Sequence, residues 1–210
     1  MGLIQTIPGQ DYSLVDKRYE NHDGVIVDVG CLGWEWSGIF LGNKRVIGID
    51  PQGYPIENTE FFKGILGPFD GIARLEEQKL DNFGTGVDGN FGSPAKVSGN
   101  NEGDLFDVIS WKSLCKKFNI DQVSILKINI EGMEYPLLNS MDVNDYSKID
   151  QIAISFHDFW YPEQKLLAQS SIKLLESVGF TVTPIWPQWG WWLAVSNREG
   201  TGLVPFINGV

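Results

Sequence analysis

The sequence has little cysteine and no long hydrophobic run. Cys31 and Cys115 are the only thiols among its 210 residues, and two thiols can neither form a disulfide framework nor complete a zinc site alone. No apolar run reaches the roughly 18 residues that a membrane-spanning helix needs. The N-terminus lacks the basic start and the apolar segment of a secretory signal. We therefore expect a protein of the reducing cytoplasm that has no membrane partner.

Positive charge is also scarce. The chain carries 16 lysines and arginines against 27 aspartates and glutamates, which gives a formal net charge of −11. A surface of this kind repels nucleic-acid phosphates and anionic lipids, so neither is an expected partner. Hydrophobic residues make up 42% of the chain, which is enough for a packed core. The length suits a single domain that comprises residues 1–210.

Apolar runs rich in β-branched residues alternate with helical patterns along most of the chain. Such runs predict strands that are buried on both faces. The alternation predicts an α/β fold, in which a mostly parallel sheet carries helices on both faces. Residues 180–186 and 191–197 are joined by a tight turn, which predicts an antiparallel C-terminal hairpin. The other strands are expected at 24–30, 44–50, 59–66, 122–130 and 151–157, and the helices at 35–41, 111–120, 133–141 and 162–180. Regular structure of unspecified type is expected to resume at 106–110.

Three segments have a less regular pattern. Residues 1–23 are polar and are expected to form an N-terminal arm that packs on the domain. Residues 69–78 fit a pair of strands or a short helix. Residues 81–104 contain six glycines and show no periodicity, so we expect a long loop there. Loops of this length are usually functional or disordered, and the two interpretations are a lid over the substrate and a surface insertion.

The helix at 162–180 has the clearest pattern. Its apolar residues recur at spacings of three and four, which predicts one buried stripe along the helix. A glycine near its end, Gly179, is expected to terminate the helix. The residues of the stripe are Leu166, Leu167, Ile172, Leu174, Leu175 and Val178.

Polar residues follow several predicted strands at their carboxyl ends, where open α/β sheets bind ligands. Asp50 lies 20 residues after Gly30, a spacing at which a carboxylate binds the ribose hydroxyls of an adenosine-containing ligand. The alternative role of Asp50 is to stabilise a turn or cap a helix. Because polar groups at the ends of apolar strands are costly unless they are used or satisfied, these strand ends together indicate a ligand site.

The glycine turn after the first predicted strand argues against a dinucleotide. The fingerprint G-x-G-x-x-G lets a pyrophosphate approach the backbone at three points, but here Gly30 and Gly33 are followed by Trp36 at the next candidate position. S-adenosylmethionine contains adenosine without a pyrophosphate, and its positive charges suit the acidic Asp28. A nicotinamide-dependent oxidoreductase is the weaker alternative.

The order of these segments resembles that of the FkbM-type S-adenosylmethionine-dependent methyltransferases. The resemblance covers roughly residues 24–197 and rests on VIVDVG, VIGIDP, ILKINIEGMEYPLL, ISFH and LLESVGF. It implies the seven-stranded, mostly parallel, Rossmann-like methyltransferase sheet, whose last strand is antiparallel. It also implies S-adenosylmethionine as the cofactor and a hydroxyl of a sugar or natural product as the methyl acceptor. The expected partner is thus a small molecule, for example a carbohydrate.

We expect the cofactor to bind where the first two strands end. The family pattern in the first loop, D-x-G-x-N-x-G, is altered here, because the second glycine comes one residue early and Trp34 stands in its usual place. Trp34 and Trp36 are expected either to wall the cofactor or to pack the first helix. The expected cofactor-binding residues are Asp28, Gly30, Cys31, Gly33, Trp34, Ser37, Asp50, Pro51 and Gln52.

Methyl transfer to a hydroxyl needs a base whose pKa lies near the working pH. His157 is one of only two histidines and lies at a strand end, so it is the expected base, with a purely structural histidine as the alternative. Glu131 is expected to hold the cofactor ammonium or the acceptor. Asn129 completes the expected catalytic group, at a position where the family pattern has an aspartate.

Two neighbouring residues have expected structural roles. Glu134 is expected only to favour the first helical turn, and Lys127 is expected to pair with a carboxylate. The tryptophans near the C-terminal hairpin are expected to pack it, and stacking on a sugar ring is the alternative.

Two further interpretations stay open. A magnesium ion would find oxygen and nitrogen ligands in Asn129, Glu131, His157 and Asp158. An asparagine in place of a carboxylate disfavours this site, so no residue is assigned to a metal. The sequence departs from the family pattern at Trp34, at Asn129 and at Ser155, where a glutamate is common. These departures leave an inactive relative as the alternative function, one that binds the cofactor or only keeps the fold.

Overall fold

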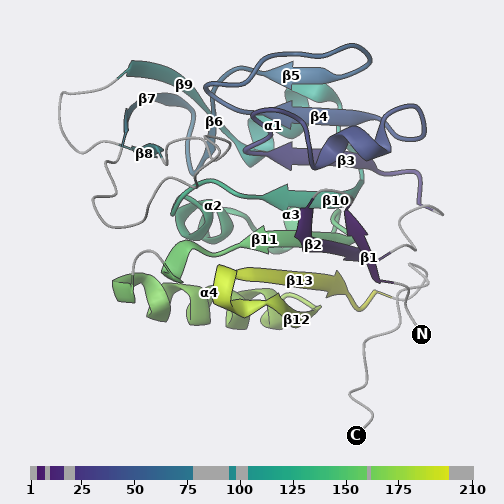
Figure 1. The fold of residues 1–210 in the computed structure, drawn as a ribbon, viewed down its shortest axis with the longest axis vertical. Helices are drawn as coiled ribbons and strands as arrows, with labels where there is room; N and C mark the ends of the chain where they lie inside the picture. Colours follow the sequence, from purple (N-terminus) through teal and green to yellow (C-terminus); the bar gives the residue numbers. More distant parts are fainter. Residues whose placement is uncertain are drawn as a thin grey trace, which may run out of the picture.

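A seven-stranded sheet forms the centre of the protein. The computed structural model describes residues 4–7, 10–16, 22–77, 95–97, 104–159 and 162–198. Across the sheet the strands are β12 (Phe180–Trp186), β13 (Trp191–Ser196), β11 (Gln151–Ser155), β10 (Val123–Ile128), β3 (Val25–Val29), β4 (Val46–Ile49) and β5 (Glu60–Phe62) (Figure 1). The pairs of β13 with β11 and β12 are antiparallel, and the other pairs are parallel. The predicted mostly parallel sheet with an antiparallel C-terminal hairpin is therefore confirmed.

The central strands are continuous apolar runs because they are buried on both faces. Val27 and Val29 of β3 lie in one core cluster, whereas Ile26 of the same strand lies in the other. Successive side chains of a strand point to opposite faces, so two-sided burial requires apolar residues at every position. The sequence pattern therefore located these strands within a residue or two.

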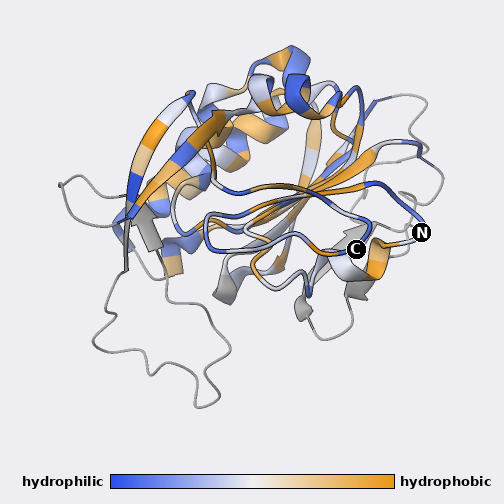
Figure 2. Ribbon diagram, turned by 90° about the horizontal axis from the view of Figure 1, so that it is seen from above, coloured by the Kyte–Doolittle hydropathy of each residue, from blue (hydrophilic) through white to orange (hydrophobic). Residues whose placement is uncertain are grey.

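The α-helices cover one face of this sheet. Figure 2 shows them gathered on one side, and all four contribute to the cluster that contains Val27. The second face is covered in part by the 3-10 helix η2 (Ser37–Phe40), whose Phe40 lies in the cluster with Ile26. The prediction of helices on both faces is thus correct only in part, since in the described ranges the second face carries a short 3-10 helix. The α-helices are α1 (Trp111–Phe118), α2 (Glu134–Ser140), α3 (Val143–Tyr146) and α4 (Lys165–Ser177).

The N-terminal arm contains a hairpin that the sequence did not predict. β1 (Ile4–Ile7) and β2 (Gln10–Asp16) pair antiparallel, with Ile4 opposite Asp16. β2 contacts β11, β12 and β13, so the hairpin packs across one end of the large sheet (Figure 1). The prediction that this segment packs on the domain holds for the hairpin, and the prediction that it is irregular is wrong there.

A second, four-stranded sheet lies beside the large one. Its order is β6 (Ile65–Gly67), β9 (Asp104–Ser110), β7 (Gly71–Glu77) and β8 (Ala95–Val97). The predicted single strand at 59–66 is wrong, because it divides into β5 of the large sheet and β6 of the small one. The division falls at Lys63 and Gly64, where a Cβ on Gly64 would lie 2.5 Å from the Asp107 carbonyl oxygen.

The small sheet also includes parts of two segments whose sequence pattern is less regular. Residues 69–78, for which a strand pair and a short helix were both open, contain the single strand β7. The predicted loop at 81–104 contains β8 and begins β9 at Asp104. Residues 81–94 and 98–103 lie outside the described residues, so the lid interpretation stays a prediction.

The helix α4 buries the predicted stripe only in part. Leu166 and Leu167 are 72% and 47% exposed, whereas Ala168 and Leu175 are buried together with Ser171. The predicted members Ile172, Leu174 and Val178 pack at the border of the core. The prediction is therefore wrong for the first two leucines. They lie in the first turn of α4, directly after the 3-10 helix η4 (Pro162–Gln164), and spacing alone did not separate the two candidate faces.

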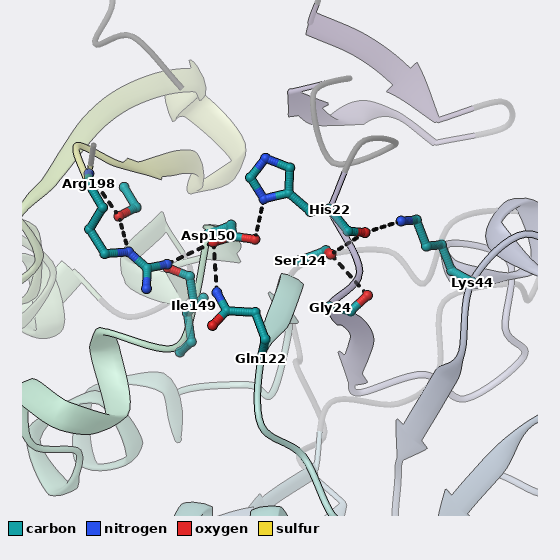
Figure 3. A network of polar contacts seen from close by, with 9 residues as sticks. His22, Gly24, Lys44, Gln122, Ser124, Ile149, Asp150 and Arg198 are labelled. Carbon is teal, nitrogen blue, oxygen red and sulfur yellow. Dashed lines mark hydrogen bonds and ion pairs between the residues drawn. The ribbon is translucent and has the colours of Figure 1, made fainter. Parts of the chain in front are cut away.

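A polar network closes the amino-terminal edge of the sheet (Figure 3). Asp150 is 1% exposed and precedes β11. Its carboxylate accepts hydrogen bonds from Gln122 Nε2 at 2.9 Å and Arg198 Nη2 at 2.7 Å, and it lies 2.7 Å from His22 Nδ1. One carboxylate therefore joins the segments that precede β3, β10 and β11 to the segment that follows β13.

Candidate functional site

The parallel strands bring two loops into contact at the carboxyl edge of the sheet. The first loop follows β3 and begins at Gly30, and the second follows β10 and begins at Asn129. Gly30 has a φ of 79°, and a Cβ there would lie 2.0 Å from the Asn129 carbonyl oxygen. Asn129 N also donates to Val29 O at 3.1 Å. Glycine at position 30 is therefore required by both the backbone conformation and this close approach.

A buried ion pair supports the first loop from beneath. Asp28 is 0% exposed and accepts a hydrogen bond from Ser37 Oγ at 2.6 Å. Lys127 Nζ lies 2.9 Å from Asp28 Oδ1 and donates to Gly30 O at 2.6 Å. The prediction that Lys127 pairs with a carboxylate is confirmed. Asp28 and Ser37, both expected at the cofactor, bind each other through Asp28 Oδ2, whereas Asp28 Oδ1 has the Lys127 ion pair but no hydrogen-bond partner among the described residues.

Trp34 packs into the second core cluster. It is 2% exposed and has a φ of 64°, an unusual backbone conformation for a bulky residue. Its Nε1 donates to Tyr54 O at 2.6 Å. A Cβ on Gly48 of β4 would lie 2.3 Å from the indole. The indole thus lies on the sheet and anchors the loop, and Trp36, 3% exposed, packs in the same cluster.

The side chain of Cys31 is equally enclosed. A Cβ on Gly48 would lie 2.8 Å from its Sγ. Burial raises the pKa of the Cys31 thiol, and the charges of Asp28 and Asp50 raise it further. Cys31 is therefore a small apolar core residue in this loop, although its backbone stays at the sheet edge.

Asp50 joins the ends of β3 and β4. Its Oδ1 accepts hydrogen bonds from Gln52 N at 2.8 Å and Gly53 N at 2.7 Å, and its Oδ2 accepts one from Leu32 N at 3.0 Å. A carboxylate offers about four acceptor positions, so one position remains on Oδ2. Asp50 thus shapes the turn that contains Pro51 and keeps room for one further donor.

Three ionisable side chains form a chain that joins the second loop to neighbouring elements: Glu131 lies in the loop, Glu134 begins α2, and His157 follows β11. His157 Nδ1 lies 2.7 Å from Glu134 Oε1, and His157 Nε2 lies 3.3 Å from Glu131 Oε2. The side chains of His157 and Glu134 are 3% and 0% exposed, whereas that of Glu131 is 24% exposed. The Nε2–Oε2 contact is an ion pair without hydrogen-bond alignment, because Glu131 Oε2 is a buried atom without a hydrogen-bond partner among the described residues.

Burial and charge act in opposite directions on this chain. Burial lowers the pKa of His157, but the charge and hydrogen bond of Glu134, followed by the charges of Glu131 and Asp158, outweigh it and raise this pKa. Burial raises the pKa of Glu131, and the charge of His157 opposes that rise. The sequence placed His157 and Glu131 correctly at neighbouring strand ends, whereas the ionic link through Glu134 was not predicted.

Glu134 also holds the backbone of the second loop. Its Oε1 accepts a hydrogen bond from Ile130 N at 3.0 Å, and its Oε2 accepts one from Gly132 N at 2.7 Å. Between them Glu131 and Gly132 have φ values of 55° and 95°. The prediction that Glu134 only favours the first helical turn is wrong. In the sequence, only the spacing of three residues between Glu131 and Glu134 indicated that the two side chains share a site.

Two more buried polar atoms lie at this end of the molecule. Gln164 Oε1 and Trp186 Nε1 have no hydrogen-bond partner among the described residues. A Cβ on Gly132 would lie 3.4 Å from the Gln164 amide, so Gln164 faces the second loop. Trp186 ends β12, which runs parallel to β11 and so ends at the same edge.

Comparison with known proteins identifies the family. Residues 74–182 match the family model of the methyltransferase FkbM domain, which is more than half of the chain. The chain belongs to the FkbM methyltransferase family. This confirms the resemblance found in the sequence.

A solved structure of an FkbM methyltransferase is also similar to this chain. The crystal structure of methyltransferase FkbM from Methylobacillus flagellatus KT is 16% identical to this chain and has a TM-score of 0.42. The match covers 82% of this chain and 43% of that chain, so the present chain spans less than half the length of that protein. No curated protein matches the sequence.

Two properties of this FkbM chain bear on the remaining expectations. Among the described residues, no group of three or more His, Cys, Asp or Glu side chains has a metal-binding arrangement. No helix in the described ranges has the length and hydrophobicity to cross a membrane. The contacts described above make the chain of Glu131, His157 and Glu134, beside the Gly30 loop, the candidate site.

Proposed function

We propose that this protein transfers a methyl group from S-adenosylmethionine to a hydroxyl of a small polar acceptor, such as a sugar or a natural product. The observation that carries the proposal is Glu131. Its Oε2 is a buried acceptor atom without a hydrogen-bond donor among the described residues, 3.3 Å from His157 Nε2. It lies in the loop that touches Gly30 through Asn129. A base for the acceptor hydroxyl thus lies beside the loop expected to hold the methyl donor.

The carboxyl edge of β3 and β4 fits the adenosyl part of the donor. Asp50 Oδ2 keeps one acceptor position, which suits one ribose hydroxyl. The backbone from Gly30 to Gly33 and the turn of Pro51 and Gln52 border that position. The side chains of Asp28, Cys31, Trp34 and Ser37, all buried, would support these loops rather than touch the ligand.

The groups of the protein would act on the acceptor side. When bound, S-adenosylmethionine supplies a methyl group whose bond to sulfur breaks as the bond to the acceptor oxygen forms, with the electron pair left on sulfur. Glu131 would take the proton that the acceptor hydroxyl loses, and a raised pKa suits this role. Gln164 Oε1 and Trp186 Nε1 would meet other hydroxyls of the acceptor, because a buried acceptor and a buried donor both need partners.

The first test is binding. Titration calorimetry with S-adenosylhomocysteine is expected to give saturable, one-site binding, with NAD as a control that gives none. Transfer of a labelled methyl group to a panel of sugars and polyols then tests the reaction, and E131Q is expected to lower it by about a hundredfold. No binding of S-adenosylhomocysteine at millimolar concentration would exclude the function.

A second candidate, an inactive relative that binds the cofactor, is favoured by one observation. Three of the roughly four acceptor positions of Asp50 are filled by backbone N–H groups, so the carboxylate cannot bind both ribose hydroxyls in this conformation. This candidate predicts weak binding and no transfer to any acceptor of the panel. Transfer that is lost in E131Q with binding intact would exclude it.

A further inference from the structure

We propose that Glu134 is a positioning residue of the transfer site. It holds His157 with its proton on Nδ1 and its Nε2 directed at Glu131, so that Glu131 rather than His157 meets the acceptor hydroxyl. The inference rests on the proposed function, in which Glu131 meets the acceptor hydroxyl. The arrangement of the three side chains can be tested without any ligand.

The contacts of Glu134 fix the proton on His157. Both carboxylate oxygens of Glu134 accept backbone N–H groups, from Ile130 and Gly132. Both N–H groups thus use Glu134 as an acceptor, and a carboxylate has no hydrogen of its own to donate. His157 Nδ1, 2.7 Å from Oε1, must therefore carry a hydrogen. The other ring nitrogen, Nε2, is thereby the one that faces Glu131.

Exposure separates the roles of the two outer groups. The His157 side chain is 3% exposed and lies between two carboxylates, whereas the Glu131 side chain is 24% exposed. An acceptor from solution can therefore reach the exposed part of the Glu131 side chain, next to its buried Oε2, and not the imidazole. Glu134 also holds the turn that presents Glu131, because it accepts from the residues on both sides of it.

The surrounding charges agree with this division. Glu134, Glu131 and Asp158 act on His157, and together they outweigh its burial and raise its pKa. A raised pKa means that less of the imidazole is neutral and able to take up a proton. Burial raises the pKa of Glu131, and together with the charge of Glu134 it outweighs the opposing charges of His157 and Lys127. Burial raises the pKa of Asp158, and the charges of Lys165 and His157 oppose that rise.

Nuclear magnetic resonance of the histidines tests the proposal directly. The chain has only two histidines, so H22Q leaves the ¹⁵N signals of His157 alone, and His22 lies in the network at the opposite edge of the sheet. Signals recorded from about pH 5 to about pH 9 give the tautomer and the titration midpoint. We expect Nδ1 protonation throughout and a midpoint above that of an ordinary histidine. Protonation of Nε2 alone in the neutral form would overturn the proposal, and this result needs no further variant.

Two matched variants complete the test. E134Q places an amide among N–H donors, so we expect a lower midpoint for His157 and loss of the single tautomer. E163Q makes the same change at an exposed residue of η4 and is expected to leave both unchanged. With an acceptor found in the panel, E134Q is expected to lower methyl transfer by about tenfold or more and to leave S-adenosylhomocysteine binding intact. An unchanged midpoint and tautomer in folded E134Q would refute the positioning role.

Discussion

Replacement of Lys127 by methionine tests whether the buried ion pair supports the first loop. Lys127 Nζ lies 2.9 Å from Asp28 Oδ1 and donates to Gly30 O, and the two side chains are 5% and 0% exposed. K127M keeps much of the side-chain volume but leaves Asp28 as a buried charge without its cation. Breaking a buried pair on one side costs about 3–5 kcal/mol.

The double variant separates the charge from the packing. In D28N/K127M no charge of the pair is left buried, and the amide oxygen introduced at position 28 can still accept from Ser37. The remaining loss is two hydrogen bonds, from Lys127 Nζ to Gly30 O at 2.6 Å and to Val29 O at 3.3 Å, each of which contributes about 1 kcal/mol. The free energy of unfolding should therefore recover by about 1–3 kcal/mol relative to K127M.

Urea unfolding followed by tryptophan fluorescence measures these differences. The matched control is K112M, because Lys112 forms a 2.7 Å ion pair with Asp142 whose side chains are 66% and 44% exposed. An exposed pair of this kind adds little to stability, so K112M should resemble the wild type. If K127M loses no more stability than K112M, or if the double variant is less stable than K127M, the reasoning is refuted.

Three smaller predictions follow from other parts of the structure. D150N removes the negative charge that meets Arg198 at 2.7 Å, and we expect a loss of about 2 kcal/mol in urea unfolding; a stability equal to the wild type would contradict this. G48A places a Cβ 2.3 Å from the Trp34 indole, which should cost about 1–3 kcal/mol and lower the melting temperature; an unchanged melting temperature would place the indole elsewhere. Burial raises the pKa of Cys115 to about 11, so the thiolate is scarce at neutral pH. Alkylation of Cys115, measured in a C31A background, should be slow at neutral pH and should accelerate until about pH 11. Fast alkylation at neutral pH would refute the burial of this thiol.

The large sheet could be predicted from the sequence because each of its central strands has a recognisable local hydrophobic pattern. A run such as Val25–Val29 is apolar at nearly every position, and only two-sided burial requires that. The strands of the small sheet lack such a hydrophobic pattern. β7 and β9 lie far apart in the chain, and exposed residues such as Ile72 and Leu105 gave no alternation to follow. The division between β5 and β6 depends on the close approach of Gly64 to Asp107, a contact between distant segments.

The candidate site could be predicted as a place but not as a set of contacts. Strand-end reasoning placed Glu131 and His157 together, because parallel strands end at one edge. The same reasoning treated Asp28 as a ligand contact, although its partner is Lys127 on the neighbouring strand. A polar residue at a strand end has the same local pattern whether it meets a ligand or another side chain. Only the pairing of β3 with β10 distinguishes the two cases.

In the altered first loop, the packing of Trp34 compensates for the strain of a backbone conformation that glycine adopts easily. The family pattern has glycine at position 34, and a non-glycine residue with a positive φ costs about 1–3 kcal/mol. Trp34 adopts a φ of 64° and is 2% exposed. Burial of roughly 150–250 Å² of aromatic surface contributes about 4–6 kcal/mol at about 25 cal/mol per Å², so the packing of the indole on Gly48 outweighs the strain. Because the hydrogen bond from Trp34 to Tyr54 joins this loop to the turn that follows Asp50, the core holds both loops of the proposed donor site in place before any ligand arrives.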